Sequence, residues 1–294
     1  MRFRELIDLV GELANNNDYK YSGVKVSTAK DLINEVQRRI CRERWWSWLL
    51  KTTTFSTVAS QEEYLLPKDL REIYTIIEGS TPQKLSFIGQ DDFDILEPLT
   101  SDTGVPTHYR YYGLKNTVYT TGTVAVTAAS KLVTGTGTSW STANNIYSHQ
   151  RITIDDTDEV YTIASAPSTT LMALNESVVT TDTSSTYSIK IDNQIIRLYP
   201  IPDSAITITL RYFKNLLNLI DDEDESEIAD DSILAYGAAM LIKAKNDEDV
   251  TWLSSIYQKI LKDMRTQDSE RFDHIDQFSH PIGTISSQWD PFQR

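Results

Sequence analysis

The 294-residue sequence has a single cysteine, Cys41, and only four histidines. One cysteine cannot form an internal disulfide, so a disulfide-stapled secreted scaffold is excluded and a reducing compartment is expected. The histidines are too scattered for a metal-ligand motif; they are His108, His149, His274 and His280. Cysteine and histidine therefore predict no metal site.

Long apolar runs and a basic excess are also missing. No stretch approaches the ~20 apolar residues of a membrane-spanning helix, and the N-terminus is amphipathic rather than continuously apolar like a signal peptide. We therefore expect a soluble protein made in the cytoplasm, with no membrane partner. The formal net charge of −14 disfavours DNA binding, because phosphate contacts need clustered Lys and Arg. An acidic wall would instead let duplex DNA slide past without sticking.

The motifs of common enzyme classes are absent as well. The chain lacks G-x-x-x-x-G-K-[ST], H-E-x-x-H and G-x-S-x-G, and in "GTGTSW" Trp140 stands where a dinucleotide-binding motif needs its third glycine. Cys41 has arginine neighbours that would favour a low thiol pKa, but no histidine lies close in sequence to act as a base. We therefore expect no enzyme, no cofactor and no metal.

The acidic run "DDEDESEIADD" allows two interpretations. Alternating Asp222, Asp224 and Ser226 are typical of a calcium loop, but the glycine and the distal bidentate glutamate of such a loop are missing. A solvated loop with carboxylates near a helix N-terminus is the favoured interpretation.

The composition that is present is globular, with 40% hydrophobic and 10% aromatic residues. Apolar residues at helical spacing predict a helix over residues 3–13 and a second one that begins at Ser27 or Thr28. Two more helices are predicted in "SILAYGAAMLIKAK" and "DVTWLSSIYQKILKDM".

Three tryptophans, Trp45, Trp46 and Trp48, follow the second predicted helix. We interpret them as aromatic anchors of the core. The alternative is a cofactor site or a stacking platform for nucleic-acid bases, which needs basic residues along the groove, and the next stretch supplies few. That stretch alternates Thr with aromatic residues and reads as β-strands.

Residues 119–190 differ from both flanks because they are rich in Ser and Thr and poor in charge. Short alternating runs such as "TVAVT" and "EVYTI", separated by turn residues, predict a small all-β domain, a barrel or a sandwich. Low-complexity disorder is the alternative, but the period-two apolar residues give a sheet one face to bury. Aromatic-rich strands resume after residue 190, which indicates that this β domain is inserted into a host fold.

The C-terminal segment, residues 273–294, combines helix breakers with large apolar side chains. Pro281, Gly283 and Pro291 disfavour a long helix. We therefore predict an extended tail that docks on a partner. Its predicted docking residues are Phe278, Ile282, Ile285, Trp289 and Phe292.

Several segments stand in a recognisable order: "INEVQRRICRERWWSWL", "FSTVASQEEYLLPKDLREIYTI", "LSFIGQDDFDILEP", "TGVPTHYRYYGL" and "IIRLYPIPDSAITITLRYF". Their order, across most of residues 1–118 and 191–265, resembles the adaptor, or head-to-tail connector, proteins of tailed bacteriophages. The resemblance implies a ring, typically a dodecamer, that joins the portal protein to a tail or nozzle protein while double-stranded DNA passes through its channel. It also implies a place in the virion neck, assembly in host cytoplasm, and the portal as the partner of the C-terminal tail.

Together these observations predict an α+β fold. A helical-bundle core with short β-strands is expected over residues 1–118 and 191–272, an inserted β domain over 119–190 and the extended tail over 273–294. The predicted function is a structural virion protein without catalytic activity. A virion-associated carbohydrate-binding or cell-wall-degrading protein is the alternative, because Thr-rich β domains with exposed aromatics can bind sugars and a lytic site needs only two carboxylates. A cytosolic DNA-binding regulator is a third hypothesis, which the acidic net charge disfavours.

Overall fold

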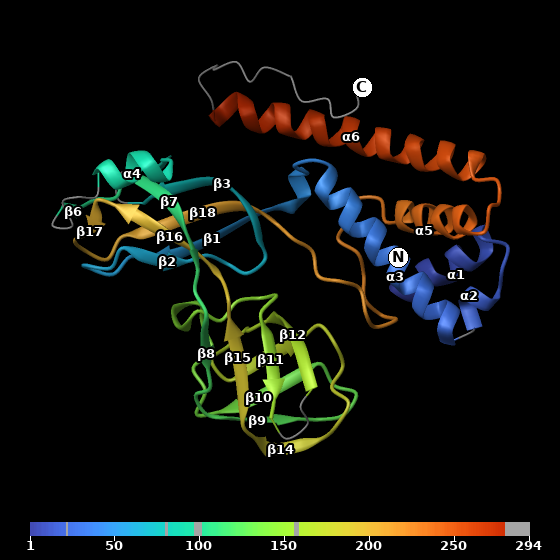
Figure 1. The fold of residues 1–294 in the computed structure, drawn as a ribbon, viewed down its shortest axis with the longest axis horizontal. Coiled ribbons are helices and arrows are strands. Elements are labelled where there is room, and N and C mark those ends of the chain that lie inside the picture. The colour runs from blue at the N-terminus through green and yellow to red at the C-terminus, as the bar shows by residue number, and fades with distance from the viewer. Residues whose placement is uncertain (22, 80–81, 97–101, 156–158, 280–294) are drawn as a thin grey trace.

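The computed structural model describes residues 1–294 except 22, 80–81, 97–101, 156–158 and 280–294. Figure 1 shows three groups of elements: a set of helices, a pair of stacked sheets, and a separate sheet-rich part below them. The helices are α1 (Phe3–Leu13), α2 (Asp18–Tyr21), α3 (Gly23–Glu43), α4 (Gln90–Leu96), α5 (Ser232–Lys245) and α6 (Thr251–Ser279).

Helices α1, α3 and α5 pack together around one hydrophobic cluster. The helix α1 buries Phe3, Leu6 and Val10 on the face that the sequence spacing predicts. The helix α3 begins at Gly23, earlier than the predicted Ser27 or Thr28. Phe213, from a strand, completes the cluster, so the helices share their core with a sheet.

Gly237 of α5 lies where α3 and α6 come close to α5. A Cβ atom there would lie 2.7 Å from Val36 Cγ1 of α3 and 3.1 Å from Tyr257 Cε2 of α6. We expect Gly237→Leu to lower the free energy of unfolding by about 1–3 kcal/mol, because overpacking forces neighbours out of their rotamers. Urea unfolding measures the effect. Gly23→Ala is the matched control, since nothing lies within 4 Å of its Cβ position, and an equal loss in both variants would contradict the packing argument.

Two four-stranded sheets stack face to face, with strand orders β1-β18-β3-β4 and β2-β16-β7-β5. Apolar side chains from both sheets meet in one cluster that includes Ile76, Ile196 and Leu210. The strands of the first sheet are β1 (Leu50–Ser56), β3 (Leu70–Glu78), β4 (Gln83–Lys84) and β18 (Thr207–Lys214). Those of the second are β2 (Glu63–Leu65), β5 (Ser86–Phe87), β7 (His108–Leu114) and β16 (Gln194–Tyr199). A short parallel pair joins β6 (Thr103–Gly104) to β17 (Ile201–Pro202).

The predicted helical-bundle core with short strands is wrong. Strands hold 34% of the residues and helices 31%, and the sheets are large and mainly antiparallel. The β1–β18 and β7–β16 pairs join segments that lie far apart in sequence. Segments such as "LREIYTIIE" and "TITLRYFK" alternate apolar and polar residues, so their pairing creates sheets with an apolar face, and a second sheet rather than a helix covers that face.

The third group is an eight-stranded sheet built from consecutive residues, Thr117–Ile191. Its strands are β8 (Thr117–Tyr119), β9 (Thr123–Val126), β10 (Leu132–Thr136), β11 (Arg151–Ile154), β12 (Glu159–Ser165), β13 (Leu171–Leu174), β14 (Asp182–Ser185) and β15 (Tyr187–Ile191). The β8–β15 register, with Tyr119 opposite Ile189, continues as the β9–β14 register, with Val124 opposite Ser185. Strand β8 continues along the chain into β9, and β14 continues into β15, so the two ends of the strand order belong to one continuous pair of strands. The sheet therefore closes on itself as a small barrel.

This unit, called the β8–β15 barrel below, has its own apolar core. The core contains Trp140, whose Nε1–H donates to the Tyr187 hydroxyl at 3.0 Å, and that hydroxyl donates to the Thr121 carbonyl at 2.6 Å. None of the residues in this cluster belongs to the clusters of the helices or of the stacked sheets. The barrel core is thus self-contained.

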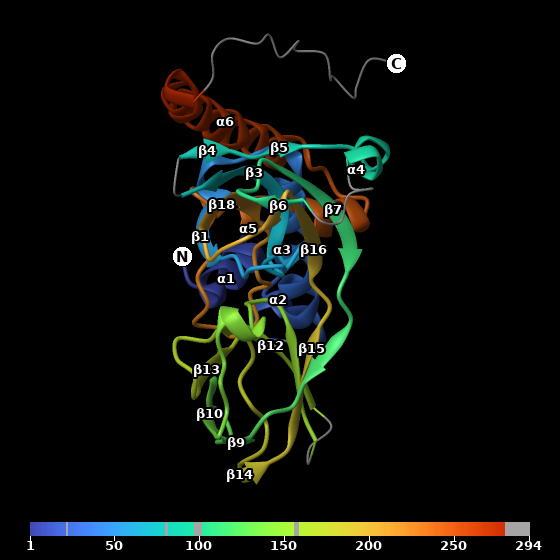
Figure 2. The same ribbon diagram turned by 90° about the vertical axis from the view of Figure 1, so that its left-hand side faces the viewer.

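Helix α6 and the β8–β15 barrel lie at opposite ends of the molecule in both views (Figures 1 and 2). The helix continues to Ser279, so the prediction of an extended chain is wrong for residues 273–279. These residues contain no proline or glycine, and the helix ends just before His280, the residue that precedes Pro281, where α-helical backbone is disfavoured. The remainder of the predicted tail lies outside the described residues.

Candidate interaction surfaces

The β8–β15 barrel is joined to the stacked sheets by two neighbouring chain crossings. Strand β7 leads into β8 and β15 leads into β16, and Leu114 pairs with Gln194 at the last position of the host sheet. The backbone N–H of Lys115 donates to the Asn193 carbonyl at 2.9 Å, so the two crossings stay paired as they leave the host. The barrel therefore sits on a two-stranded stem.

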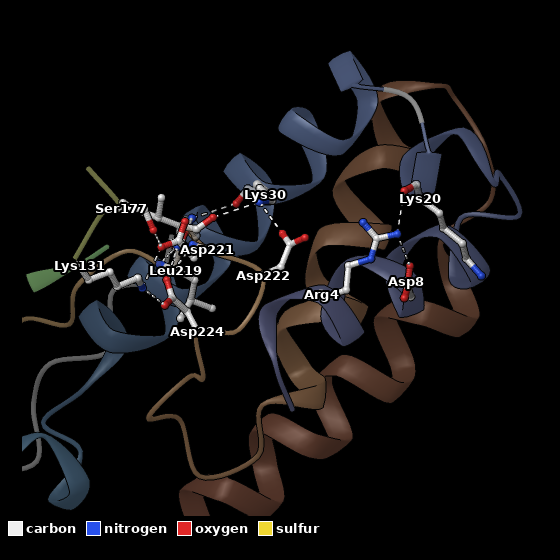
Figure 3. A network of polar contacts seen from close by, with 12 residues as sticks. Arg4, Asp8, Lys20, Lys30, Lys131, Ser177, Leu219, Asp221, Asp222 and Asp224 are labelled. Carbon is white, nitrogen blue, oxygen red and sulfur yellow. Dashed lines mark hydrogen bonds and ion pairs between the residues drawn. The ribbon is translucent and has the colours of Figure 1, made fainter. Parts of the chain in front are cut away.

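A second attachment runs through residues 215–231, called the 215–231 loop, between β18 and α5. Figure 3 shows Lys131 of the barrel pointing at two carboxylates of this loop. Its Nζ lies 2.6 Å from Asp224 Oδ1 and 3.0 Å from Asp221 Oδ2. The Ser177 hydroxyl of the barrel also donates to Asp221, at 2.8 Å. Burial raises the pKa of Asp221, but the hydrogen bonds from Lys131 and Ser177 outweigh it and hold that pKa below its usual value.

The same loop is fastened to the helices on its other side. Lys30 of α3 forms an ion pair with Asp222 at 2.8 Å, as Figure 3 shows, and the Asn34 side chain both donates to and accepts from the backbone of Leu219 at 2.8 Å. The Phe3 N–H of α1 donates to the Asp224 carbonyl at 2.7 Å. The loop thus couples the barrel to helices α1 and α3.

Asp224 organises the loop itself. Its Oδ2 accepts hydrogen bonds from the backbone N–H groups of Ile220 at 2.7 Å and Asp221 at 2.9 Å, while its Oδ1 faces Lys131. The Asp222 and Asp224 carboxylates, whose spacing is typical of a calcium loop, therefore bind lysine side chains and backbone N–H groups. Within the described ranges, no group of three or more metal-ligating side chains is present.

Sequence reasoning missed this coupling. The acidic run was interpreted as a solvated loop. In the structure, Asp221 and Asp224 instead bind a lysine from a segment about 90 residues earlier. No local pattern around Lys131 marks it as their partner.

His149 lies where the barrel meets the host. It adopts a left-handed backbone conformation, φ 70°, and its ring nitrogens are buried near the backbone of Asn215 and Leu216. Burial lowers the pKa of His149, and the nearby Asp69 carboxylate offsets this only in part. The folded protein therefore favours the neutral ring.

Acidification from pH 7 to pH 5 is expected to destabilise the protein through His149. The unfolded chain binds the proton at a higher pH than the folded chain does, so the free energy of unfolding falls as the pH drops below the ordinary histidine value of about 6.5. His149→Asn tolerates the left-handed backbone and should flatten the pH dependence measured by urea unfolding in this window. An unchanged slope in the variant would show that another group carries the effect.

The three tryptophans occupy different environments. Trp46 is fully buried and its Nε1–H donates to the Ile40 carbonyl at 2.6 Å. Trp48 is half-buried against the helical cluster. Trp45 is 45% exposed, with its ring centroid 5.1 Å from that of Phe213 and the Arg71 guanidinium 4.5 Å above it.

Cys41 differs from the expectation of a low-pKa thiol. It is buried, and burial raises the pKa of its thiol to about 12 in spite of the Arg71 charge. The thiol is therefore unreactive in the folded protein.

The predicted docking residues of the tail are at the edge of the described chain or beyond it. Phe278 lies in α6, near its C-terminal end. Ile282, Ile285, Trp289 and Phe292 lie outside the described residues.

Aromatic and basic side chains gather where β7 leaves the stacked sheets. Arg110 is buried, forms an ion pair with Asp94 of α4 at 2.9 Å, and lies 4.3 Å from the Phe93 ring centroid. The Arg197 guanidinium lies 3.4 Å from the Tyr112 ring centroid. These contacts fix α4 and the start of the stem.

Among the helices of the described ranges, none combines the length and apolar character that crossing a membrane requires.

Comparison with known proteins places the chain in a family. A search of curated proteins found no match. A family model described as SU10 adaptor protein matches residues 1–149 and residues 125–277. The two stretches overlap and together reach across most of the chain, through helices, stacked sheets and barrel. The protein therefore belongs to the SU10 adaptor family, a family of structural adaptor proteins of bacteriophages.

Proposed function

We propose that this protein forms a ring, with twelve copies as the expected number, that joins the portal to the tail and lets double-stranded DNA pass through its channel. Family membership carries the proposal, since it makes the chain a virion component of the head–tail region that contacts other virion proteins. Nothing in the part of the chain that the structure describes favours the carbohydrate-binding or cell-wall-degrading alternative.

The charge supports a non-adhesive channel. Each copy carries a formal net charge of −14, and a ring of such copies repels a phosphate backbone rather than binding it. Assembly in host cytoplasm fits the single cysteine, which is buried as a free thiol.

The test is the oligomeric state of the purified protein with and without its portal protein, by native mass spectrometry and electron microscopy. A ring seated on the portal supports the proposal. A protein that stays monomeric with the portal present, or that clears cell-wall substrate, overturns it.

The C-terminal segment is the proposed portal contact. Phe278 and the apolar residues after it would bury their side chains against the portal, and each buried side chain of this size contributes roughly 1.5–3 kcal/mol. Truncation after Ser279 should weaken portal attachment and leave the thermal midpoint of the free subunit unchanged. If the truncated protein attached to the portal as well as the full chain does, the segment would not be part of the interface.

A further inference from the structure

Strand β7 and its continuation into β8 present an open edge. Among the described strands, β5 covers β7 only at His108 and Tyr109, and β8 pairs with β15 alone. In the described part of the chain, no strand pairs with the outer side beyond Tyr109. Residues 112–118 are all exposed, and they include Leu114 at 67% and Val118 at 60%.

A second open edge lies on β1. This strand is at the end of its sheet and pairs with β18 alone. Its seven residues, Leu50–Ser56, match the exposed run 112–118 in length, and Lys51, Thr52, Thr54 and Ser56 are exposed. Open edges offer unpaired N–H and C=O groups, so an assembled particle gains from covering them.

The two edges lie on opposite sides of the subunit. Figure 2 shows β1 on the left of the subunit and β7 on the right. Two different complementary surfaces on opposite sides are what a head-to-tail contact requires, and such contacts close into rings when the rotation between copies allows it.

We propose that neighbouring copies join by strand addition, with β1 of one copy pairing along the 112–118 edge of the next. The occupant of the edge is thus a second copy of this chain. Main-chain hydrogen bonds supply the contact, and the exposed Leu114 and Val118 side chains bury against the neighbour. This inference rests on the proposed ring and names the surfaces that build it.

Thiol cross-linking of the assembled protein tests the pairing. Thr54→Cys and Leu114→Cys are made as single variants, and Cys41 gives no background because it is buried. A short bis-maleimide should cross-link an equal mixture of the two variants into covalent dimers and leave each variant alone uncross-linked. The double variant should give a ladder of higher species.

Leu132→Cys is the matched control, since Leu132 is 52% exposed on the barrel strand β10, away from either edge. Two results would overturn the strand pairing but not the ring. One is that Thr54→Cys cross-links to Leu132→Cys as well as it does to Leu114→Cys, and the other is that Leu114→Cys cross-links to itself. A protein that is monomeric with portal before cross-linking overturns the ring as well.

Charge substitution gives a second measurement. Leu114→Glu with Val118→Glu would bury two unpaired carboxylates in the contact, so the subunit dissociation constant should rise at least ~10-fold in analytical ultracentrifugation. Leu132→Glu should leave it unchanged. Circular dichroism shows that the variants are folded, and equal dissociation constants for all three proteins would overturn the proposal.

Discussion

Replacing residues 116–192 with an Asn-Gly turn is expected to leave a soluble host that unfolds cooperatively. The ends of the cut already lie together, because Lys115 donates to the Asn193 carbonyl at 2.9 Å and Leu114 pairs with Gln194. An Asn-Gly turn suits such a pair, so β7 and β16 become an ordinary hairpin.

The energetic reason is that the barrel shares no apolar core with the host. The deletion removes polar contacts, chiefly Lys131 with Asp221 and Asp224, and each lost hydrogen bond costs about 0.5–1.5 kcal/mol. We expect the host to lose several kcal/mol, because Ser177, Asn175 and Asp192 also bond to the host and are removed with the barrel. The matching fragment, residues 116–192 alone, should fold with its own transition, since β8 pairs with β15 and closes the sheet.

Calorimetry on the full chain, the host and the fragment measures these outcomes. An aggregated host, or a fragment without a transition, would show that the barrel and the host fold as one body. The predicted domain boundary at residues 119 and 190 would then be wrong.

Local patterns predicted helix α1 and several strands well. The apolar spacing over residues 3–13 matches α1, which buries Phe3, Leu6 and Val10. The period-two runs between residues 119 and 190 match strands such as β9 and β12. Both depend on neighbours a few residues away, and such signals are readable from sequence alone.

The stacked sheets were missed because their partners are distant. Strand β1 pairs with β18 more than 150 residues later, and β2 pairs with β16. The strands were visible one by one, but no local signal tells that they form two sheets whose apolar faces cover each other. The prediction therefore assigned the core mainly to the helices.

The polar coupling was hidden for a related reason. In the sequence, Asp224 is one of many acidic residues in "DDEDESEIADD". Its role depends on Lys131 and on the turn that brings the Ile220 and Asp221 N–H groups to its carboxylate. Charge runs are usually solvated faces, so sequence could not separate this carboxylate from Glu223, whose side chain is 75% exposed.

Asp224→Ala should lower the free energy of unfolding by about 2–4 kcal/mol. It removes the acceptor of two backbone N–H groups and of Lys131 at once, and donors left without a partner in a partly buried site cost about 1–3 kcal/mol each. Asp224→Asn keeps an acceptor oxygen and should lose roughly half as much. Urea unfolding measures all three proteins.

Glu223→Ala is the matched control one residue away. Its carboxylate pairs with Arg2 at 2.8 Å, but both side chains are largely exposed, and such pairs contribute about 0–1 kcal/mol. A double-mutant cycle of Asp224→Ala with Lys131→Met then separates the ion pair from the backbone contacts, and a coupling of about 1 kcal/mol is expected. If Asp224→Ala costs no more than Glu223→Ala, Asp224 does not hold the loop, and the barrel is attached through its stem and the contacts of Asp221.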